Sequence, residues 1–173
     1  MKHIILIGFM GSGKTRVGRR LARHLELPFI DMDEQIVERA KMPVTEIFEK
    51  YGEAHFRELE TKVLEELLDI KEQMVISAGG GVAVQKANQE YLKETIVVYL
   101  QATVATLVKR LSGDATRPIL NGGNLKEKIM ALKEERDPIY EQVSNIAINT
   151  SNMGVLEIVT RLSKEIAKYE EGT

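Results

Sequence analysis

The sequence predicts a three-layer α/β fold in which helices cover both faces of a five-stranded, mainly parallel sheet. Short apolar runs alternate with longer segments whose apolar residues recur with helical spacing, and this order is typical of repeated strand-helix-strand units. The 173 residues suit one domain spanning 1–173, because domains commonly contain about 100 to 200 residues. A formal net charge of -2 argues against a basic nucleic-acid surface, and the absence of cysteine excludes disulfides and thiolate metal sites.

Five apolar runs are the expected strands, because each is too short for an ordinary helix. They are residues 3–7, 28–31, 74–78, 95–100 and 145–149. Helices are expected between them, where apolar residues form a stripe. The first begins at the glycine-rich loop after the first strand, and the others cover residues 33–40, 44–50, 53–70, 85–93, 104–111, 125–142 and 155–166.

Residues 8–15 read Gly-Phe-Met-Gly-Ser-Gly-Lys-Thr and match the phosphate-binding pattern G-x-x-x-x-G-K-[ST]. Glycines in this pattern let backbone amides turn toward a phosphate, Lys14 can reach the outer phosphates of a nucleotide, and Thr15 can ligate Mg²⁺. The motif follows an apolar strand and opens an amphipathic helix, which is the context that the pattern requires. The sequence therefore predicts a nucleoside triphosphate site, and a glycine-rich turn without a ligand is the alternative.

Acidic residues and glycines follow the second and third expected strands. Asp31 and Asp33 come after the second strand, and three glycines at residues 79–81 come after the third. Ligands of parallel α/β sheets bind beyond the carboxyl ends of the strands, so these residues are expected at the mouth of the site. One carboxylate can hold the water shell of Mg²⁺, and another can accept a hydrogen bond or a proton from an attacking hydroxyl. Helix capping is the alternative for Asp33.

Two arginines are candidates for binding a small carboxylate, because a guanidinium group matches a carboxylate in bidentate geometry. Arg57 lies one helical turn before Glu60, and Arg136 precedes the segment Asp-Pro-Ile-Tyr. A surface ion pair with Glu60 is the alternative for Arg57, and a solvated helix end is the alternative for Arg136. The fold decides whether both arginines reach one pocket.

Residues 112–124 interrupt the helical pattern with glycines and a proline, which is typical of a mobile surface loop or lid. Arg117 lies in this segment. A cationic lid residue that closes over phosphates fits the chemistry of phosphoryl transfer, and a loop charge without a role is the alternative.

Taken together, these segments resemble the shikimate kinases, a family of small phosphate-loop kinases related in fold to the nucleoside monophosphate kinases. The resemblance covers nearly the whole chain and implies a P-loop kinase fold with a substrate-binding region at 33–60 and a mobile lid at 112–124. The residues that carry it are 8–15, 29–33, Gly52-Glu53, Phe56-Arg57 with Glu60, the glycines at 79–81, residues 117–120, and Arg136 with Pro138 and Tyr140.

The resemblance also implies roles for individual residues. Lys14, Asp33 and Arg117 would be catalytic, and Thr15 and Asp31 would serve Mg²⁺. The residues implied in nucleotide binding are Gly11, Ser12, Gly13, Lys14, Thr15, Arg16, Arg110 and Arg117. Those implied in shikimate binding are Asp33, Arg57, Gly79, Gly80, Gly81 and Arg136, with the arginines at the carboxylate and Asp33 at the hydroxyls.

The implied reaction transfers the γ-phosphate of ATP to the 3-hydroxyl of shikimate, with Mg²⁺ as cofactor, in chorismate and aromatic amino acid biosynthesis. We expect a cytoplasmic monomer that binds neither nucleic acid nor membranes, since the chain has no basic excess, no long apolar run and no room for a leader before its first strand. A kinase of gluconate or of a nucleoside monophosphate is the nearest alternative. A nucleotide-binding switch is more distant, because the guanine signature N-K-x-D is absent.

A few positions depart from the usual pattern of the family. Lys41 stands where glycine is common after the second helix, and Arg16 stands where a small residue usually follows the phosphate motif. Ala78 replaces a frequent hydroxyl residue before the glycines, and Asn145 replaces a frequent aspartate before the fifth strand.

Overall fold

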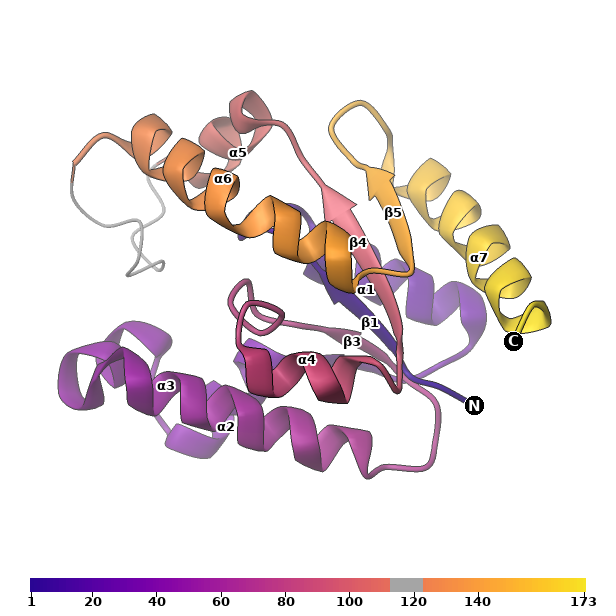
Figure 1. The fold of residues 1–173 in the computed structure, drawn as a ribbon, viewed down its shortest axis with the longest axis horizontal. Helices are drawn as coiled ribbons and strands as arrows, with labels where there is room; N and C mark the ends of the chain where they lie inside the picture. The colour runs from indigo at the N-terminus through magenta and orange to yellow at the C-terminus, as the bar shows by residue number, and fades with distance from the viewer. Residues whose placement is uncertain (113–122) are drawn as a thin grey trace.

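The computed structural model describes residues 1–112 and 123–173. Within these ranges five strands form one parallel sheet in the order β2-β3-β1-β4-β5, and the predicted fold class is confirmed (Figure 1). The strands are β1 (Ile4–Ile7), β2 (Phe29–Asp31), β3 (Val75–Ser77), β4 (Ile96–Gln101) and β5 (Ile146–Asn149). Each strand coincides with a predicted apolar run to within one residue at its carboxyl end.

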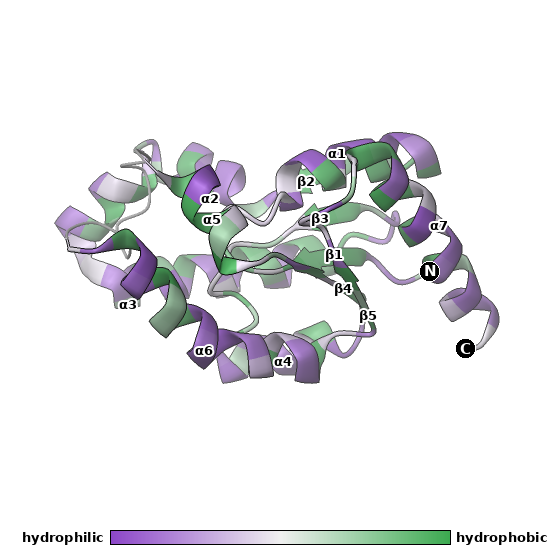
Figure 2. Ribbon diagram, turned by 90° about the horizontal axis from the view of Figure 1, so that it is seen from above, coloured by the Kyte–Doolittle hydropathy of each residue, from purple (hydrophilic) through white to green (hydrophobic). Residues whose placement is uncertain are grey.

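Helices lie on both faces of the sheet (Figure 2). One face is covered by α1 (Lys14–Leu25) and α7 (Val155–Glu171), and the other by α3 (Val44–Leu68), α4 (Lys86–Leu92) and α6 (Leu125–Val143). Two further helices pack on this framework, α2 (Met32–Ala40) against α3 and α5 (Val104–Leu111) against α6. No helix in the described ranges combines the length and the apolar character that a membrane span needs.

The central strand β1 is buried on both faces. Its side chains alternate, so that Ile5 and Ile7 enter the core beneath α3 and α4, whereas Ile4 and Leu6 enter the core beneath α1 and α7. A third apolar cluster packs α5 and α6 against the phosphate loop (residues 8–15) beyond the end of β1. The loop therefore projects from the fully buried central strand of the sheet, with β3 on one side and β4 on the other.

Helix α3 contains a break at Gly52, where the sequence predicts a boundary between two helices. The φ of 83° and ψ of 170° at Gly52 are not helical, and residues with a Cβ are strongly disfavoured there. Nothing lies within 4 Å of the position that a Cβ would occupy, so the backbone conformation alone requires glycine. The second half of α3 then buries Phe56, Val63 and Leu64 against the sheet.

Helix α2 ends at Ala40 and is capped by Lys41, which adopts a left-handed conformation with a φ of 57° and a ψ of 32°. Its N–H donates to the carbonyl of Val37 at 2.8 Å and so closes the last turn. The Lys41 side chain is exposed. A residue with a Cβ is strained in this conformation, which is why glycine is the common choice at the end of a helix.

Replacing Lys41 with glycine is therefore expected to stabilise the protein by about 1 kcal/mol, because it removes the strain of the left-handed residue. Urea unfolding followed by circular dichroism measures this change. Lys41→Ala is the matched control, since it also removes the charge but keeps the Cβ, and it should give no gain. Equal stabilities of the glycine and alanine variants would contradict the strain at this position.

Candidate active site

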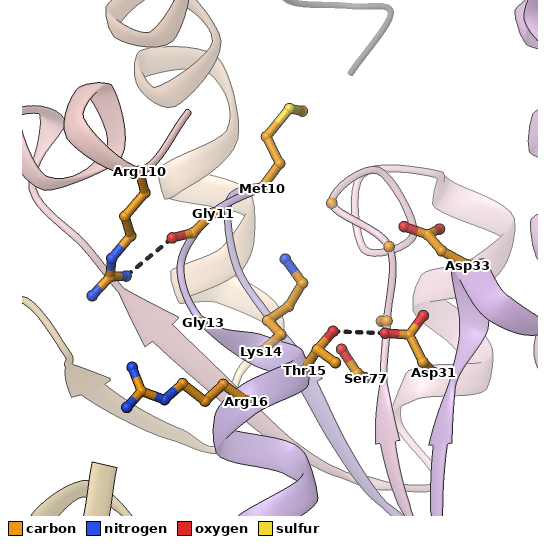
Figure 3. Close-up of a pocket in the computed structure, with 13 residues that line it drawn as sticks. Met10, Gly11, Gly13, Lys14, Thr15, Arg16, Asp31, Asp33, Ser77 and Arg110 are labelled. Carbon is orange, nitrogen blue, oxygen red and sulfur yellow. Dashed lines mark hydrogen bonds between the residues drawn. The ribbon is translucent and has the colours of Figure 1, made fainter. Parts of the chain in front are cut away.

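A cavity of about 320 Å³ opens at the carboxyl ends of β1, β2 and β3 (Figure 3). Its lining comes from the phosphate loop, the residues after β2 and β3, and the end of α5. The lining residues are Met10, Gly11, Gly13, Lys14, Thr15, Arg16, Asp31, Asp33, Ser77, Ala78, Gly79, Gly80 and Arg110. The strand order thus brings the nucleotide motif and the residues predicted for the acceptor into one cavity.

The phosphate loop has a conformation that its glycines make possible. Gly11 and Gly13 have φ values of 81° and 96°, and a Cβ on Gly8 would lie 2.6 Å from the Leu100 carbonyl oxygen. The loop leads directly into α1, whose first N–H groups and positive dipole end attract anions. Lys14 is buried, and its Nζ donates to the carbonyl oxygens of Gly8 at 2.8 Å and Phe9 at 3.1 Å.

Thr15 and Asp31 form the oxygen-rich corner of the cavity (Figure 3). The Thr15 hydroxyl donates to Asp31 Oδ2 at 2.6 Å, and Asp31 Oδ1 accepts from the backbone N–H of Glu34 at 3.1 Å. The described residues contain no cluster of three or more histidine, aspartate or glutamate side chains that could enclose a metal ion. A hydroxyl and one carboxylate suit Mg²⁺, which completes its shell with water and phosphate oxygens.

The structure corrects the capping alternative for Asp33. The N-cap of α2 is Asp31, and the helix begins at Met32, one residue before its predicted start. Asp33 therefore lies inside the first turn and reaches the turn after β3, where a Cβ on Gly79 would lie 3.1 Å from its Oδ1. Asp31 and Asp33 consequently occupy different parts of the cavity (Figure 3).

The glycine turn (residues 79–81) has a charged side chain against each of its three residues. A Cβ on Gly79 would lie 2.6 Å from Glu60 Oε2, and a Cβ on Gly81 would lie 2.1 Å from Arg57 Nη1. A Cβ on Gly80 would lie 3.3 Å from Arg136 Nη1. A side chain at any of these positions would displace the charged group that lies against it.

Arg57 and Glu60 form a buried ion pair, so the surface alternative for Arg57 is wrong. Arg57 Nη1 lies 2.6 Å from Glu60 Oε1, and the two side chains are 13% and 1% exposed. Burial raises the pKa of Glu60 to about 7, while the Arg57 charge acts in the opposite direction. Sequence reasoning assigned Glu60 no role in the site beyond pairing with Arg57, although it continues the buried stripe four residues after Phe56 and four before Leu64.

Arg136 lies within α6 and is 6% exposed, so the solvated helix end is also wrong. Its Nη1 is buried and has no hydrogen-bond partner among the described residues, and the same is true of Arg57 Nε. One turn further along α6, the Tyr140 hydroxyl donates to the Gly80 carbonyl at 2.5 Å. Sequence reasoning gave Tyr140 no role. The glycine turn is therefore contacted by both arginines, by both acids and by Tyr140.

Arg110 and Arg16 stand at the nucleotide side of the cavity (Figure 3). Arg110 Nη1 donates to the Gly11 carbonyl at 3.0 Å. Both arginines also line a neighbouring cavity of about 360 Å³, whose apolar surface includes Met153, Val155 and Ile158. Arg117 and most of the predicted lid at 112–124 lie outside the described residues.

The raised pKa of Glu60 predicts how its contribution to stability changes with pH. The carboxyl ionises near 4.5 in the unfolded chain and near 7 in the folded protein, so the unfolded chain releases its proton first as the pH rises. The stability that Glu60 contributes is thus full below pH 4.5 and is lost as the pH rises through 7. The free energy of unfolding of the wild type minus that of Glu60→Gln should fall by about 2 kcal/mol between pH 5 and 8.

Urea unfolding at a series of pH values measures this difference. Glu58→Gln is the control, since Glu58 is an exposed neighbour on the same helix, and its difference from the wild type should stay flat. A difference for Glu60→Gln that increases with pH would refute the assignment.

Comparisons with known proteins agree with this geometry. The family model for shikimate kinase matches residues 10–167. The shikimate kinase of Thermodesulfovibrio yellowstonii is 37% identical over 99% of both chains. That of Enterococcus faecalis is 40% identical over 96% of this chain and 99% of its own.

Comparison with solved structures also finds a shikimate kinase. A shikimate kinase from Acinetobacter baumannii in complex with shikimate is 37% identical and superposes with a TM-score of 0.93, covering 98% of this chain and 94% of that one. A gluconokinase from Sinorhizobium meliloti superposes with a TM-score of 0.65 at 21% identity, which shows a shared fold alone. The match to the family model along most of the sequence, together with relatives at this level of identity, establishes that the chain belongs to the shikimate kinase family.

Proposed function

We propose that this chain transfers the γ-phosphate of ATP to the 3-hydroxyl of shikimate in a cavity that has a donor half and an acceptor half. As a member of its family, it is an ATP- and Mg²⁺-dependent kinase that phosphorylates shikimate in aromatic biosynthesis. The observation that carries the assignment of residues is the convergence of Asp33, Arg57 and Arg136 on the glycine turn beside the phosphate loop.

The donor half consists of the phosphate loop and the first turn of α1. Lys14 exchanges the carbonyl oxygens of Gly8 and Phe9 for phosphate oxygens, which carry full negative charge. The N–H groups at the start of α1 add positive potential to the same place. Thr15 and Asp31 would hold Mg²⁺, which neutralises charge on the phosphates.

The acceptor half binds a small acid that carries hydroxyl groups. Arg57 Nε and Arg136 Nη1 are buried donors without partners among the described residues, and a ligand carboxylate would supply the missing acceptors. Asp33 faces the same turn and is placed to accept a hydrogen bond, and then the proton, from the attacking hydroxyl. Gly79, Gly80 and Gly81 allow the charged groups and the substrate to approach the backbone.

Catalysis then depends on position and charge. The carboxylate clamp fixes one end of the acceptor, and Asp33 fixes the hydroxyl that attacks, so the reaction becomes effectively unimolecular. Lys14 stabilises the charge that develops on the transferred phosphoryl group. Arg117 and the lid at 112–124 remain a prediction for the same task.

We assign the remaining nucleotide contacts to the phosphate loop and to two arginines beside it. Gly11, Ser12 and Gly13 present backbone to the phosphates. Arg110, which borders both cavities, is assigned to the base, and Arg16 to the phosphates. The apolar surface of the second cavity suits a flat purine ring.

A single chain of one domain, in which residues 33–60 bind the substrate, supplies all of these groups. Each half of the site is built within one chain, and this supports a monomer as the active form. We assign the enzyme to the cytoplasm, because that compartment supplies its nucleotide. Light scattering at assay concentrations tests the monomer.

A coupled assay of ADP release with shikimate, gluconate and nucleoside monophosphates as acceptors tests the function. Shikimate alone is expected to stimulate turnover, because only a hydroxylated carboxylic acid with a compact ring satisfies both arginines and Asp33. Turnover that shikimate does not raise above the background hydrolysis of ATP would overturn the proposal.

Replacing Arg136 with lysine should raise the KM for shikimate by about 10- to 100-fold, because lysine cannot form the paired hydrogen bonds of a guanidinium group with a carboxylate. The KM for ATP should stay within twofold. Arg161→Lys on the exposed face of α7 is the control, and it should change neither constant. Equal weakening of both substrates by Arg136→Lys would argue against a carboxylate clamp.

A further inference from the structure

We propose that Tyr140 is a positioning residue whose hydroxyl holds the glycine turn against the helix that carries Arg136. This inference rests on the proposed function, since it concerns how the acceptor half keeps its geometry. Tyr140 acts through the backbone of Gly80 and through the Arg136 side chain, which also interacts with its hydroxyl.

The hydrogen bond joins two elements that are distant in the sequence. Tyr140 and Arg136 are four residues apart on α6, so their side chains leave the same face of the helix. The Tyr140 hydroxyl donates to the Gly80 carbonyl at 2.5 Å, in a region where the tyrosine side chain is fully buried. The same helical face therefore presents both the cation of the acceptor half and the donor that fixes the turn below it.

Gly80 is the point at which this bond affects the site. A Cβ on Gly80 would lie 3.3 Å from Arg136 Nη1 and 3.5 Å from the backbone nitrogen of Met10 in the phosphate loop. Gly80 is thus packed between the acceptor cation and the donor loop. A shift of this peptide changes the distance between the two halves of the site, on which an in-line transfer depends.

The ring and the hydroxyl of Tyr140 have separable tasks. The ring packs against Tyr99 with centroids 5.2 Å apart, and it belongs to the main apolar core. Burial raises the pKa of the hydroxyl to about 12, against the effect of the Arg136 charge, so the group stays protonated and remains a donor. Phenylalanine keeps the ring and removes only the hydroxyl, so the Gly80 carbonyl loses its donor and Arg136 loses the hydroxyl oxygen beside it.

Tyr99 offers a matched control inside the same core. Its side chain is 3% exposed, and its hydroxyl donates to Asp137 Oδ1 at 2.9 Å. Lys133 binds the other oxygen of Asp137, so this carboxylate keeps a partner when the tyrosine hydroxyl is removed. Tyr99→Phe therefore deletes a tyrosine hydroxyl next to Tyr140 in the same core without removing a hydrogen bond to the glycine turn.

The test measures steady-state kinetics of Tyr140→Phe and Tyr99→Phe with each substrate varied in turn. Tyr140→Phe should raise the KM for shikimate about tenfold and leave the KM for ATP within twofold, since a buried carbonyl without its donor lets the turn move. Tyr99→Phe should keep both constants within twofold of the wild type. Equal changes in the two variants, or equal changes in both KM values of Tyr140→Phe, would show a merely structural role.

The wild type in the same assay separates the positioning role of Tyr140 from the proposed function. Turnover that depends on shikimate in the wild type, with no selective change in Tyr140→Phe, overturns the positioning role and leaves the proposed function intact. Absence of that turnover overturns the proposed function itself.

A second variant keeps the test decisive if the phenylalanine protein does not fold. Incorporation of 3-fluorotyrosine at position 140 retains the ring and the donor and provides a ¹⁹F signal. Saturation with shikimate should shift this signal, and a nonhydrolysable ATP analogue alone should shift it less. A signal that shikimate does not move would overturn the link between Tyr140 and the acceptor half.

Discussion

The absence of side chains at residues 79–81 is the constraint on which the acceptor half of the site depends. Gly79 leaves room for two acids and Gly80 for Arg136, and the space that a single Cβ would take at Gly81 is occupied by the Arg57 guanidinium. The groups come from α2 and α3, which follow one another along the chain, and from the distant α6. The glycine turn is therefore the place where charged side chains from three helices meet.

Close approach of these groups is sustainable because the two acids lie beside two arginines of opposite charge. Glu60 and Asp33 lie against Gly79, whereas Arg136 and Arg57 lie against Gly80 and Gly81. Buried charges without partners are costly, and the ion pair of Arg57 with Glu60 offsets much of that cost. Arg57 and Arg136 still carry buried donors that lack partners among the described residues, and these are the donors that the proposed function assigns to a ligand carboxylate.

Local patterns in the sequence were sufficient for the strands, for the phosphate loop and for the break at Gly52. Hydrophobic spacing and glycine placement determine these features over short distances. The prediction of Asp33 as the N-cap of α2 was wrong. Asp31 and Asp33 are both good capping residues, and only the exact end of β2 decides between them. The meeting of Arg57 with Arg136 depends on strand order and helix packing, which no local pattern encodes. The sequence could have indicated that Glu60 is buried, because it is an acid within an apolar helical stripe. No sequence pattern indicates the hydrogen bond of the Tyr140 hydroxyl to Gly80.

The break at Gly52 also separates two helical phases within α3. In a continuous helix, one inserted residue rotates everything beyond it by about 100°, which would turn a functional face away from its target. A non-helical residue lets the second half start with a phase of its own, set by the packing of Phe56 and Leu64 on the sheet. The segment before Gly52 can thus change in length or composition while the Arg57 side chain still points at the glycine turn. Variation in the first half of α3 therefore leaves the geometry of the site unchanged.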